Sequence, residues 1–273
     1  ELEWVSIYTF QCRRMTDFRH GRVLFVGDAA HQVSPFGARG ANSGFQDTDD
    51  LMWKLALVIK GQASDKLLDT YAHDRQFAAD ENIMNSTRST DFITPKSRTS
   101  RTFRNSVLAL AKDYPFARKL VNSGRLSVPS FLTESVLNTP DAEAFAGQMV
   151  PGAPMDDAPV QVLGQDAWLL DQVGKGFQCL LFVDAVPGPD TLAALQGLKQ
   201  GAVPVDTLIV SPVALSVPGW TVLVDAQGWM AKRYDGQAGT TYLLRPDQHV
   251  VARWRQLQVG AVQAAVARAI CKV

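Results

Sequence analysis

The sequence has few cysteines and no excess of either charge. Cys12, Cys179 and Cys271 are odd in number, far apart and free of any CxxC motif, so neither a disulfide framework nor a zinc cluster is predicted. Lys+Arg and Asp+Glu both number 27, which argues against partners such as nucleic acid or an anionic membrane. No apolar run is long enough to cross a bilayer, and no charged-then-apolar leader opens the chain. We expect an unexported, cytoplasmic protein with small neutral partners.

The sequence also lacks an initiator methionine and a GxGxxG motif. It opens with ELEW and passes straight into VSIYTF, a run typical of a strand already under way. This beginning indicates a fragment whose N-terminal part has been removed, although processing would produce the same start. Neither GARGANSG nor GKGFQ has the spacing of a dinucleotide-binding loop.

What is present suffices for one large or two ordinary domains, since 46% of the 273 residues are hydrophobic. Residues 138–159 are rich in Pro, Gly, Ala and Asp, which predicts a linker. The predicted division is therefore a first domain over 1–137, the linker, and a second domain over 160–273.

The first domain is predicted to be mainly helical after a short strand-rich start. Residues 5–11 and 23–26 are expected to be strands. Asn42 is expected to cap a helix that Gly61 ends, with Asp47, Asp49 and Asp50 in its first turns, where the helix dipole favours acids. A second helix is expected from 64 or 65 to about 92, KSRTSRTFRN as a mobile or docking loop, and a further helix over 107–121.

The second domain alternates strands with helices and closes with a hairpin and a helix, which predicts a small α/β domain. The expected strands are 160–163, CLLFVD, DTLIV, TVLVD, TYLLR and HVVARW, and the expected helices lie near 168–173, 191–199 and 229–234 and at the C-terminal end.

The segment from Gly21 to Ala56 runs from a strand through a glycine-rich loop into a helix. Gly37, Gly40 and Gly44 remove side chains where something flat or anionic could lie, and the unpaired N–H groups at a helix start seek acceptors. A carboxylate such as Asp28 at a strand end is well placed to accept hydrogen bonds from sugar-like hydroxyls. These features favour a nucleotide or flavin site; the alternative is a tight turn whose glycines only satisfy geometry. The nearby acids are too few on one side for a hard-cation cage, so no metal is predicted.

The residues of this segment resemble a known motif. GRVLFVGDAAHQVSPFGARGANSGFQDTDDLMWKLALVIKG is similar to the second FAD-binding motif of the class A flavoprotein monooxygenases, the aromatic hydroxylases related to p-hydroxybenzoate and phenol hydroxylase. LLDTYAHDRQFAAD resembles the tyrosine and acid–arginine helix of that family, with Asp74 where glutamate is usual. YDGQAGTTYLLRPDQHVVARW resembles the thioredoxin-like domain at the end of some members. The implied fold is α/β: the C-terminal remnant of a p-hydroxybenzoate hydroxylase-like FAD-binding domain, followed by a thioredoxin-like domain without CxxC.

The resemblance assigns roles to loop residues. Asp28 would bind the ribityl chain of FAD, the backbone of Gly40, Ala41 and Asn42 would meet the pyrimidine edge of the flavin ring, and Pro35 would lie against the ring. Two further glycines complete the implied cofactor-binding set, Gly27 and Gly37.

The resemblance also bears on four further residues, Ser34, Arg39, His31 and Cys179. The family usually has two prolines where this sequence has Ser34 and Pro35. Arg39 would face the cofactor or solvent. His31 would pack behind the loop, with general base or metal ligand as the alternative. Cys179 would be an ordinary buried thiol, because disulfide exchange requires the missing second cysteine.

The resemblance implies an FAD-dependent monooxygenase that uses NAD(P)H and O2 to hydroxylate a small phenolic substrate through a flavin C4a-hydroperoxide. The alternatives are a flavoprotein epoxidase or antibiotic-modifying enzyme, and a non-catalytic assembly module. A homodimer is also implied, and no catalytic residue is identified. Because the ADP site and most of the substrate sheet of the family are missing, we expect the isolated chain to be inactive.

Overall fold

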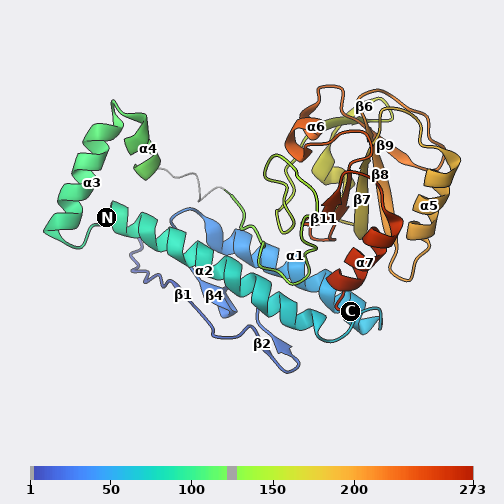
Figure 1. Ribbon diagram of the computed structural model, residues 1–273. Coiled ribbons are helices and arrows are strands. Elements are labelled where there is room, and N and C mark those ends of the chain that lie inside the picture. The colour runs from blue at the N-terminus through green and yellow to red at the C-terminus, as the bar shows by residue number, and fades with distance from the viewer. Residues whose placement is uncertain (1–2, 122–127, 273) are drawn as a thin grey trace. The chain divides into compact units, whose positions relative to one another are not determined.

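The computed structural model describes residues 3–121 and 128–272. They form two compact units (Figure 1). Unit 1 comprises Glu1–Asp49 with Arg75–Ser130, and unit 2 comprises Asp50–Asp74 with Phe131–Val273. The predicted mixed α/β class is confirmed. The first unit holds the glycine-rich loop, so it is described first.

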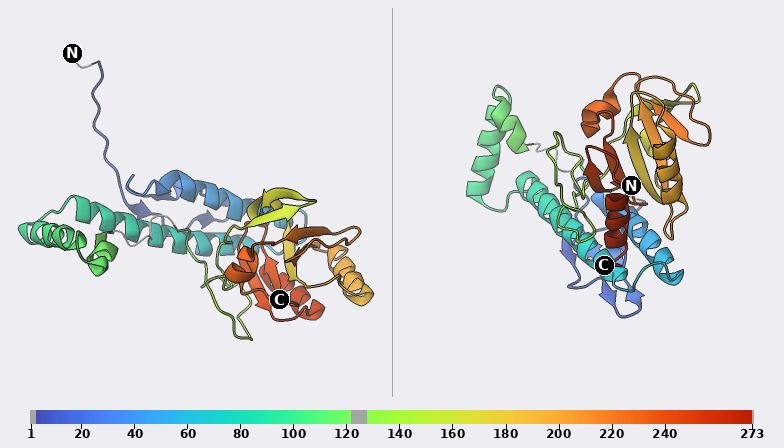
Figure 2. Two further views of the ribbon diagram at one scale, coloured as in Figure 1. Left: turned by 90° about the horizontal axis from the view of Figure 1, so that it is seen from above. Right: turned by 45° about the vertical axis from the view of Figure 1, so that its right-hand side comes forward.

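Unit 1 combines four two-residue strands with long helices. The short strands form two antiparallel pairs, β1 with β4 and β2 with β3. Helices α1 and α2 lie side by side in both views of Figure 2, and the boundary between the units crosses each of them. The bounds are β1 Arg13–Arg14, β2 Arg19–His20, β3 Val23–Leu24, the 3-10 turn η1 Gly27–Ala29, β4 His31–Gln32, α1 Arg39–Ile59, α2 Leu67–Ile93, α3 Arg98–Ala111 and α4 Pro115–Val121.

The expected strand over residues 5–11 is absent. No residue of this segment is assigned to a strand, and the chain extends away from the rest of unit 1 in Figure 2. Ile7 is 94% exposed and Tyr8 is 74% exposed. An apolar, β-branched sequence becomes a strand only when another strand accepts its hydrogen bonds, and the described residues provide none here.

Two helix predictions are also corrected. Helix α1 begins at Arg39, so Asp47 lies in its third turn, beyond the reach of the dipole at its start. Asp47 and Asp50 are buried and paired with cations instead. The basic segment KSRTSRTFRN is not a loop: Ser97 accepts a hydrogen bond from the Ser100 amide and caps α3.

Unit 2 is built on a seven-stranded sheet in the order β11-β10-β7-β8-β9-β5-β6. Strands β7, β8 and β9 are parallel, and the others pair antiparallel. The strands are β5 Pro159–Val162, β6 Gln165–Trp168, β7 Phe177–Phe182, β8 Val205–Ser211, β9 Thr221–Val224, β10 Thr241–Leu244 and β11 Val250–Trp254; the helices are η3 Leu169–Gln172, α5 Pro189–Lys199, α6 Trp229–Tyr234 and α7 Val259–Ala269.

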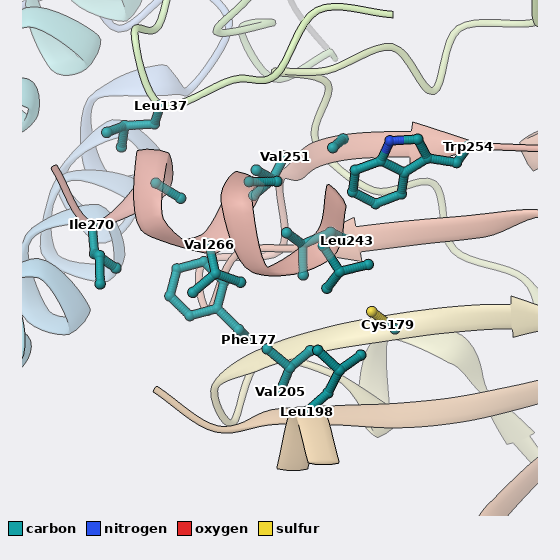
Figure 3. Close-up of a cluster of buried hydrophobic side chains, with 14 of the residues drawn as sticks. Leu137, Phe177, Cys179, Leu198, Val205, Leu243, Val251, Trp254, Val266 and Ile270 are labelled. Atoms are coloured by element: carbon teal, nitrogen blue, oxygen red, sulfur yellow. The ribbon is translucent and has the colours of Figure 1, made fainter. Parts of the chain in front are cut away.

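Both faces of this sheet are covered, as the near-continuous apolar run of β7 requires. Phe177, Cys179 and Leu181 belong to one cluster with residues of α5 and α7, shown in Figure 3. Leu180 and Phe182 alternate with them and belong to a second cluster on the other face. Burial raises the pKa of the Cys179 thiol to about 12, as expected for an inert buried cysteine.

The segment expected to be a linker contributes to the core of unit 2. Within residues 138–159, Met149, Ala153 and Met155 are buried. The Gly152 amide donates to the Val250 carbonyl at 2.7 Å, and a Cβ at Gly152 would lie 2.4 Å from the Leu132 carbonyl oxygen. Small residues, which suggested a flexible connection, here permit close backbone packing.

Five buried charged side chains form the charge cluster of unit 2. Lys54 Nζ lies 2.8 Å from Asp50 and 3.3 Å from Asp74. Arg245 lies 3.0 Å from Asp50 and 3.3 Å from Asp74, and its Nε donates to Asp247 at 2.8 Å. Three carboxylates against two cations leave one excess negative charge, and burial raises the pKa of Asp50 to about 6.

Removing the arginine should destabilise unit 2 strongly. Arg245→Met leaves buried carboxylates short of a cation, which typically costs about 3–5 kcal/mol of unfolding free energy. Lys199→Ala is the matched control, because its ion pair with Asp206 is exposed and should contribute less than about 1 kcal/mol. Urea unfolding followed by circular dichroism measures both, and equal losses would contradict a structural role for the cluster.

The raised pKa of Asp50 predicts a pH dependence of stability. The protonated form is favoured in the folded state, so its stabilisation is complete below the unfolded pKa of about 3.9 and is lost as pH rises through about 6. Asp50→Asn imitates the protonated form at every pH. Its unfolding free energy should therefore gain about 2–3 kcal/mol relative to the wild type between pH 4 and pH 7. A difference that stays constant over this range would show that Asp50 is ionised throughout.

Candidate functional site

The glycine-rich loop of unit 1 lies against the first half of α1. Gly27 has a φ of +56°, in the region that favours glycine. A Cβ at Gly44 on α1 would lie 3.5 Å from the Gly27 Cα, so the two backbones approach closely at these positions. The segment directly after β3 therefore packs against α1. Residues 33–38 then lead to the start of that helix.

The buried carboxylate of Asp47 holds this arrangement together. Its Oδ2 accepts the Gly27 amide at 2.9 Å and lies 2.7 Å from His31 Nε2. Its Oδ1 accepts Arg75 Nε at 2.7 Å. Burial by itself would raise the pKa of Asp47, but the hydrogen bond from His31 and the charge of Arg75 hold that pKa below its ordinary value. Asp47 thus joins the loop, α1 and the unit 1 part of α2.

His31 packs behind the loop. Its side chain is buried, and its ring stacks on Phe18 with centroids 5.6 Å apart. The Nε2 atom is engaged by Asp47, and Nδ1 is buried with no hydrogen-bond partner among the described residues. A ring so enclosed is placed for structural support and does not reach solvent. Among residues 3–121 and 128–272, no group of three or more His, Cys, Asp or Glu side chains is arranged to hold a metal.

The opposite side of the loop presents unused polar groups. Asp28 is exposed, and its carboxylate makes no hydrogen bond or ion pair with the part of the chain that the structure describes. The first-turn N–H groups of α1 have no partner within the helix. The sequence-predicted residues divide as follows: Gly27 and Gly40 are half-buried, and Asp28, Pro35, Gly37, Ala41 and Asn42 are exposed.

The start of α1 is shaped by a turn. The Ala38 amide donates to the Pro35 carbonyl at 3.0 Å, and Gly37 has a φ of +93°. The Asn42 side chain donates back to the Ala38 carbonyl at 2.8 Å instead of capping the helix from outside. Beside this turn lies a hollow of about 330 Å³, whose lining includes Gly37, Asn42 and the exposed ring of Phe45.

Arg39 is buried, which excludes the expectation that it faces solvent. Its guanidinium donates to Asn82 Oδ1 and, at 2.8 Å, to the Val128 carbonyl. Asn82 in turn donates to Ser43 at 2.8 Å. Sequence reasoning missed the partners in this network, because Asn82 and Val128 are far from the loop in the chain. The acid–arginine pattern on α2, which includes Arg75, was the sequence signal that could have indicated contacts between α1 and α2.

The substitution Asp47→Asn should weaken the attachment of the loop to α1 and α2. Asp47→Asn removes the charge that balances the buried Arg75, so the unfolding free energy of unit 1 should fall by about 3–5 kcal/mol. Asp113→Asn, at an exposed acid between α3 and α4, should cost less than about 1 kcal/mol. Hydrogen exchange of the Gly27 amide should accelerate in the first variant alone, and equal exchange in both would contradict the role of Asp47.

Comparison with known sequences places the loop within a recognised domain. Residues 1–86 match the family model described as FAD binding domain. The chain is 29% identical over 255 residues to a 3-(3-hydroxy-phenyl)propionate/3-hydroxycinnamic acid hydroxylase of Mycolicibacterium smegmatis, covering 89% of this chain and 44% of the relative. A hydroxylase of the same name from Comamonas testosteroni is 28% identical over 316 residues, with 97% and 53% covered. The chain spans about half the length of the curated relatives it matches.

Solved structures are similar over nearly the whole chain. The flavin-dependent monooxygenase PieE, in complex with FAD and substrate, gives a TM-score of 0.72 at 22% identity, covering 97% of this chain and 50% of PieE. A ternary complex of aklavinone-11 hydroxylase with FAD and aklavinone gives 0.66 at 24% identity, covering 95% and 45%. At these identities the likeness shows the fold.

The residues present suit the flavin end of FAD. The loop presents a free carboxylate, a glycine turn and the first-turn N–H groups of α1, and these groups match ribityl hydroxyls and the polar edge of a flavin ring. Residues 1–86 match an FAD binding domain, and the comparisons confirm that the chain resembles the FAD-dependent aromatic hydroxylases.

Proposed function

We propose that this chain carries the flavin-end half of the FAD site of an aromatic-ring monooxygenase. The observation that carries the proposal is the loop of unit 1, where buried Asp47 fixes the backbone at Gly27 while the adjacent Asp28 carboxylate stays free and exposed. Because the backbone beside Asp28 is held in place, its free carboxylate is positioned to accept hydrogen bonds from hydroxyl groups. The match of residues 1–86 to an FAD binding domain supports this assignment.

Each predicted residue then has a distinct task. Asp28 accepts hydrogen bonds from the ribityl chain. The backbone of Gly40, Ala41 and Asn42 donates to the pyrimidine edge of the ring, where the helix start also favours negative charge. Pro35 and Gly37 supply a surface without large side chains on which the ring lies. Gly27 does not touch the ring in this proposal, because its amide is engaged by Asp47.

The substrate class follows from the curated relatives, which are named as hydroxylases of 3-(3-hydroxy-phenyl)propionate and 3-hydroxycinnamic acid. We propose a small phenolic substrate with O2 and NAD(P)H as co-substrates. Bound FAD would supply the electron transfer and the activation of oxygen, while these protein residues hold and orient the ring. The ADP half of FAD would need contacts outside these residues, since the 273 residues contain no GxGxxG motif.

Unit 2 has a separate role in this proposal. A parallel β7–α5–β8 unit, the antiparallel pair β10–β11 and the final helix α7 follow the order expected of a thioredoxin-like domain. The absence of CxxC from the sequence and the high pKa of Cys179 argue against thiol–disulfide exchange. Assembly, including formation of a homodimer, is the role that we propose for it.

A titration of the purified chain with FMN, FAD and ADP tests the half-site. If only the flavin end is held, FMN and FAD should bind with dissociation constants that agree within about threefold, on the order of 0.1–1 mM. ADP should not compete. Asp28→Ala should weaken FMN binding about tenfold, because a charge-assisted hydrogen bond is lost.

The matched control is Asp113→Ala, which removes an exposed acid of the α3–α4 segment and should leave FMN affinity unchanged. Flavin fluorescence and absorbance report binding. Failure of FMN to bind at millimolar concentration, or equal binding by Asp28→Ala and the wild type, would refute the half-site.

A further inference from the structure

A cluster of three hydroxyl groups anchors the loop of unit 1 to α2. Ser34 is buried, and its Oγ lies 2.5 Å from Ser86 Oγ and 3.0 Å from Thr90 Oγ1. Ser86 and Thr90 are one helical turn apart on α2, and both face Ser34. We call these three residues the hydroxyl clamp. It lies directly before Pro35, the first residue of the turn that leads into α1.

The clamp also lies against the loop backbone. Ser86 Oγ lies 3.3 Å from the Ser34 carbonyl oxygen and 3.4 Å from the Phe36 carbonyl oxygen. The Ser34 amide donates to Cys12 Sγ at 3.3 Å. The loop backbone therefore has close contacts on both sides of Pro35.

The protons of the three hydroxyls can be assigned in one direction. Each hydroxyl has one proton to donate and can accept as well. Thr90 donates to the Ser86 carbonyl at 2.8 Å, Ser34 donates to Thr90, and Ser86 donates to Ser34. Every proton is then used, and the bonds of such a chain strengthen one another. The Thr90 hydroxyl bonds back to its own helix, as helical threonines often do, and its oxygen also accepts from the loop.

We infer that Ser34, Ser86 and Thr90 are positioning residues that fix the Pro35–Gly37 turn and thereby set the shape of the flavin surface. The inference rests on the proposed function. None of the three touches the ring itself; they act through the backbone of the loop. Without the clamp, Pro35 and Gly37 would sample several positions, and the ring would have to order them when it binds.

Ser86→Ala tests the clamp, because it removes the hydroxyl that bonds to Ser34 and lies beside both loop carbonyls. Hydrogen exchange of the Ser34 and Ala38 amides should accelerate about tenfold, and the dissociation constant for FMN should rise about five- to tenfold, as expected for one lost buried hydrogen bond. The matched control is Thr94→Ala directly after the same helix, whose hydroxyl bonds to the Thr90 carbonyl. It should change neither quantity by more than about twofold.

Ser34→Ala provides a second variant that breaks the clamp from the loop side. Because both variants interrupt one chain of hydrogen bonds, their effects on FMN affinity should be less than additive in the double variant. Faster exchange with unchanged FMN affinity, or fully additive effects, would overturn the inference. If the wild type binds no FMN, the proposed function fails; if the wild type binds and Ser86→Ala binds equally well, only the clamp fails.

Discussion

The geometry of the glycine-rich loop of unit 1 depends on the buried carboxylate of Asp47. This carboxylate accepts one backbone amide of the loop and pairs with His31 and Arg75, which come from the two separate chain segments of unit 1. A buried carboxylate with this set of partners leaves little freedom to the strand-to-helix connection. The neighbouring Asp28 can then remain free and exposed, since it has no part in holding the fold. In our proposal Asp47 has the structural role and Asp28 the binding role.

A similar principle operates in unit 2, where Lys54 and Arg245 are enclosed by three carboxylates. Both units therefore bury ionic contacts at positions where the hydrophobic pattern alone would allow several arrangements. Burying charge is costly, and in the native fold each of these buried carboxylates contacts at least one cation. In unit 1 this fixes the loop, and in unit 2 it fixes the turn after β10 against the helical segments of the same unit.

Sequence reasoning located the loop, the two long helices and every strand of unit 2 except β6 (Gln165–Trp168), because glycine spacing and hydrophobic periodicity are local signals. It failed where the structure of a residue depends on a partner distant in the sequence. The acids at 47 and 50 were expected at a helix start, yet they pair with Arg75 and Arg245 from distant segments, and Asp50 also pairs with Lys54. Residues 5–11 have strand propensity but no partner strand among the described residues. Ser34, which departs from the family pattern, became interpretable only when Ser86 and Thr90 were seen beside it.

The most direct test of the central claim is an NMR titration of the isotope-labelled chain with FMN. We predict that chemical shifts change at the amides of Asp28, Gly37 and Gly40–Asn42, with the amides of the unit 2 sheet unaffected, because the half-site lies in the loop of unit 1 and the first turn of α1. Changes that centre on the unit 2 sheet, or a loop that remains unchanged while FMN binds elsewhere, would contradict the assignment of this chain as the flavin end of an FAD site.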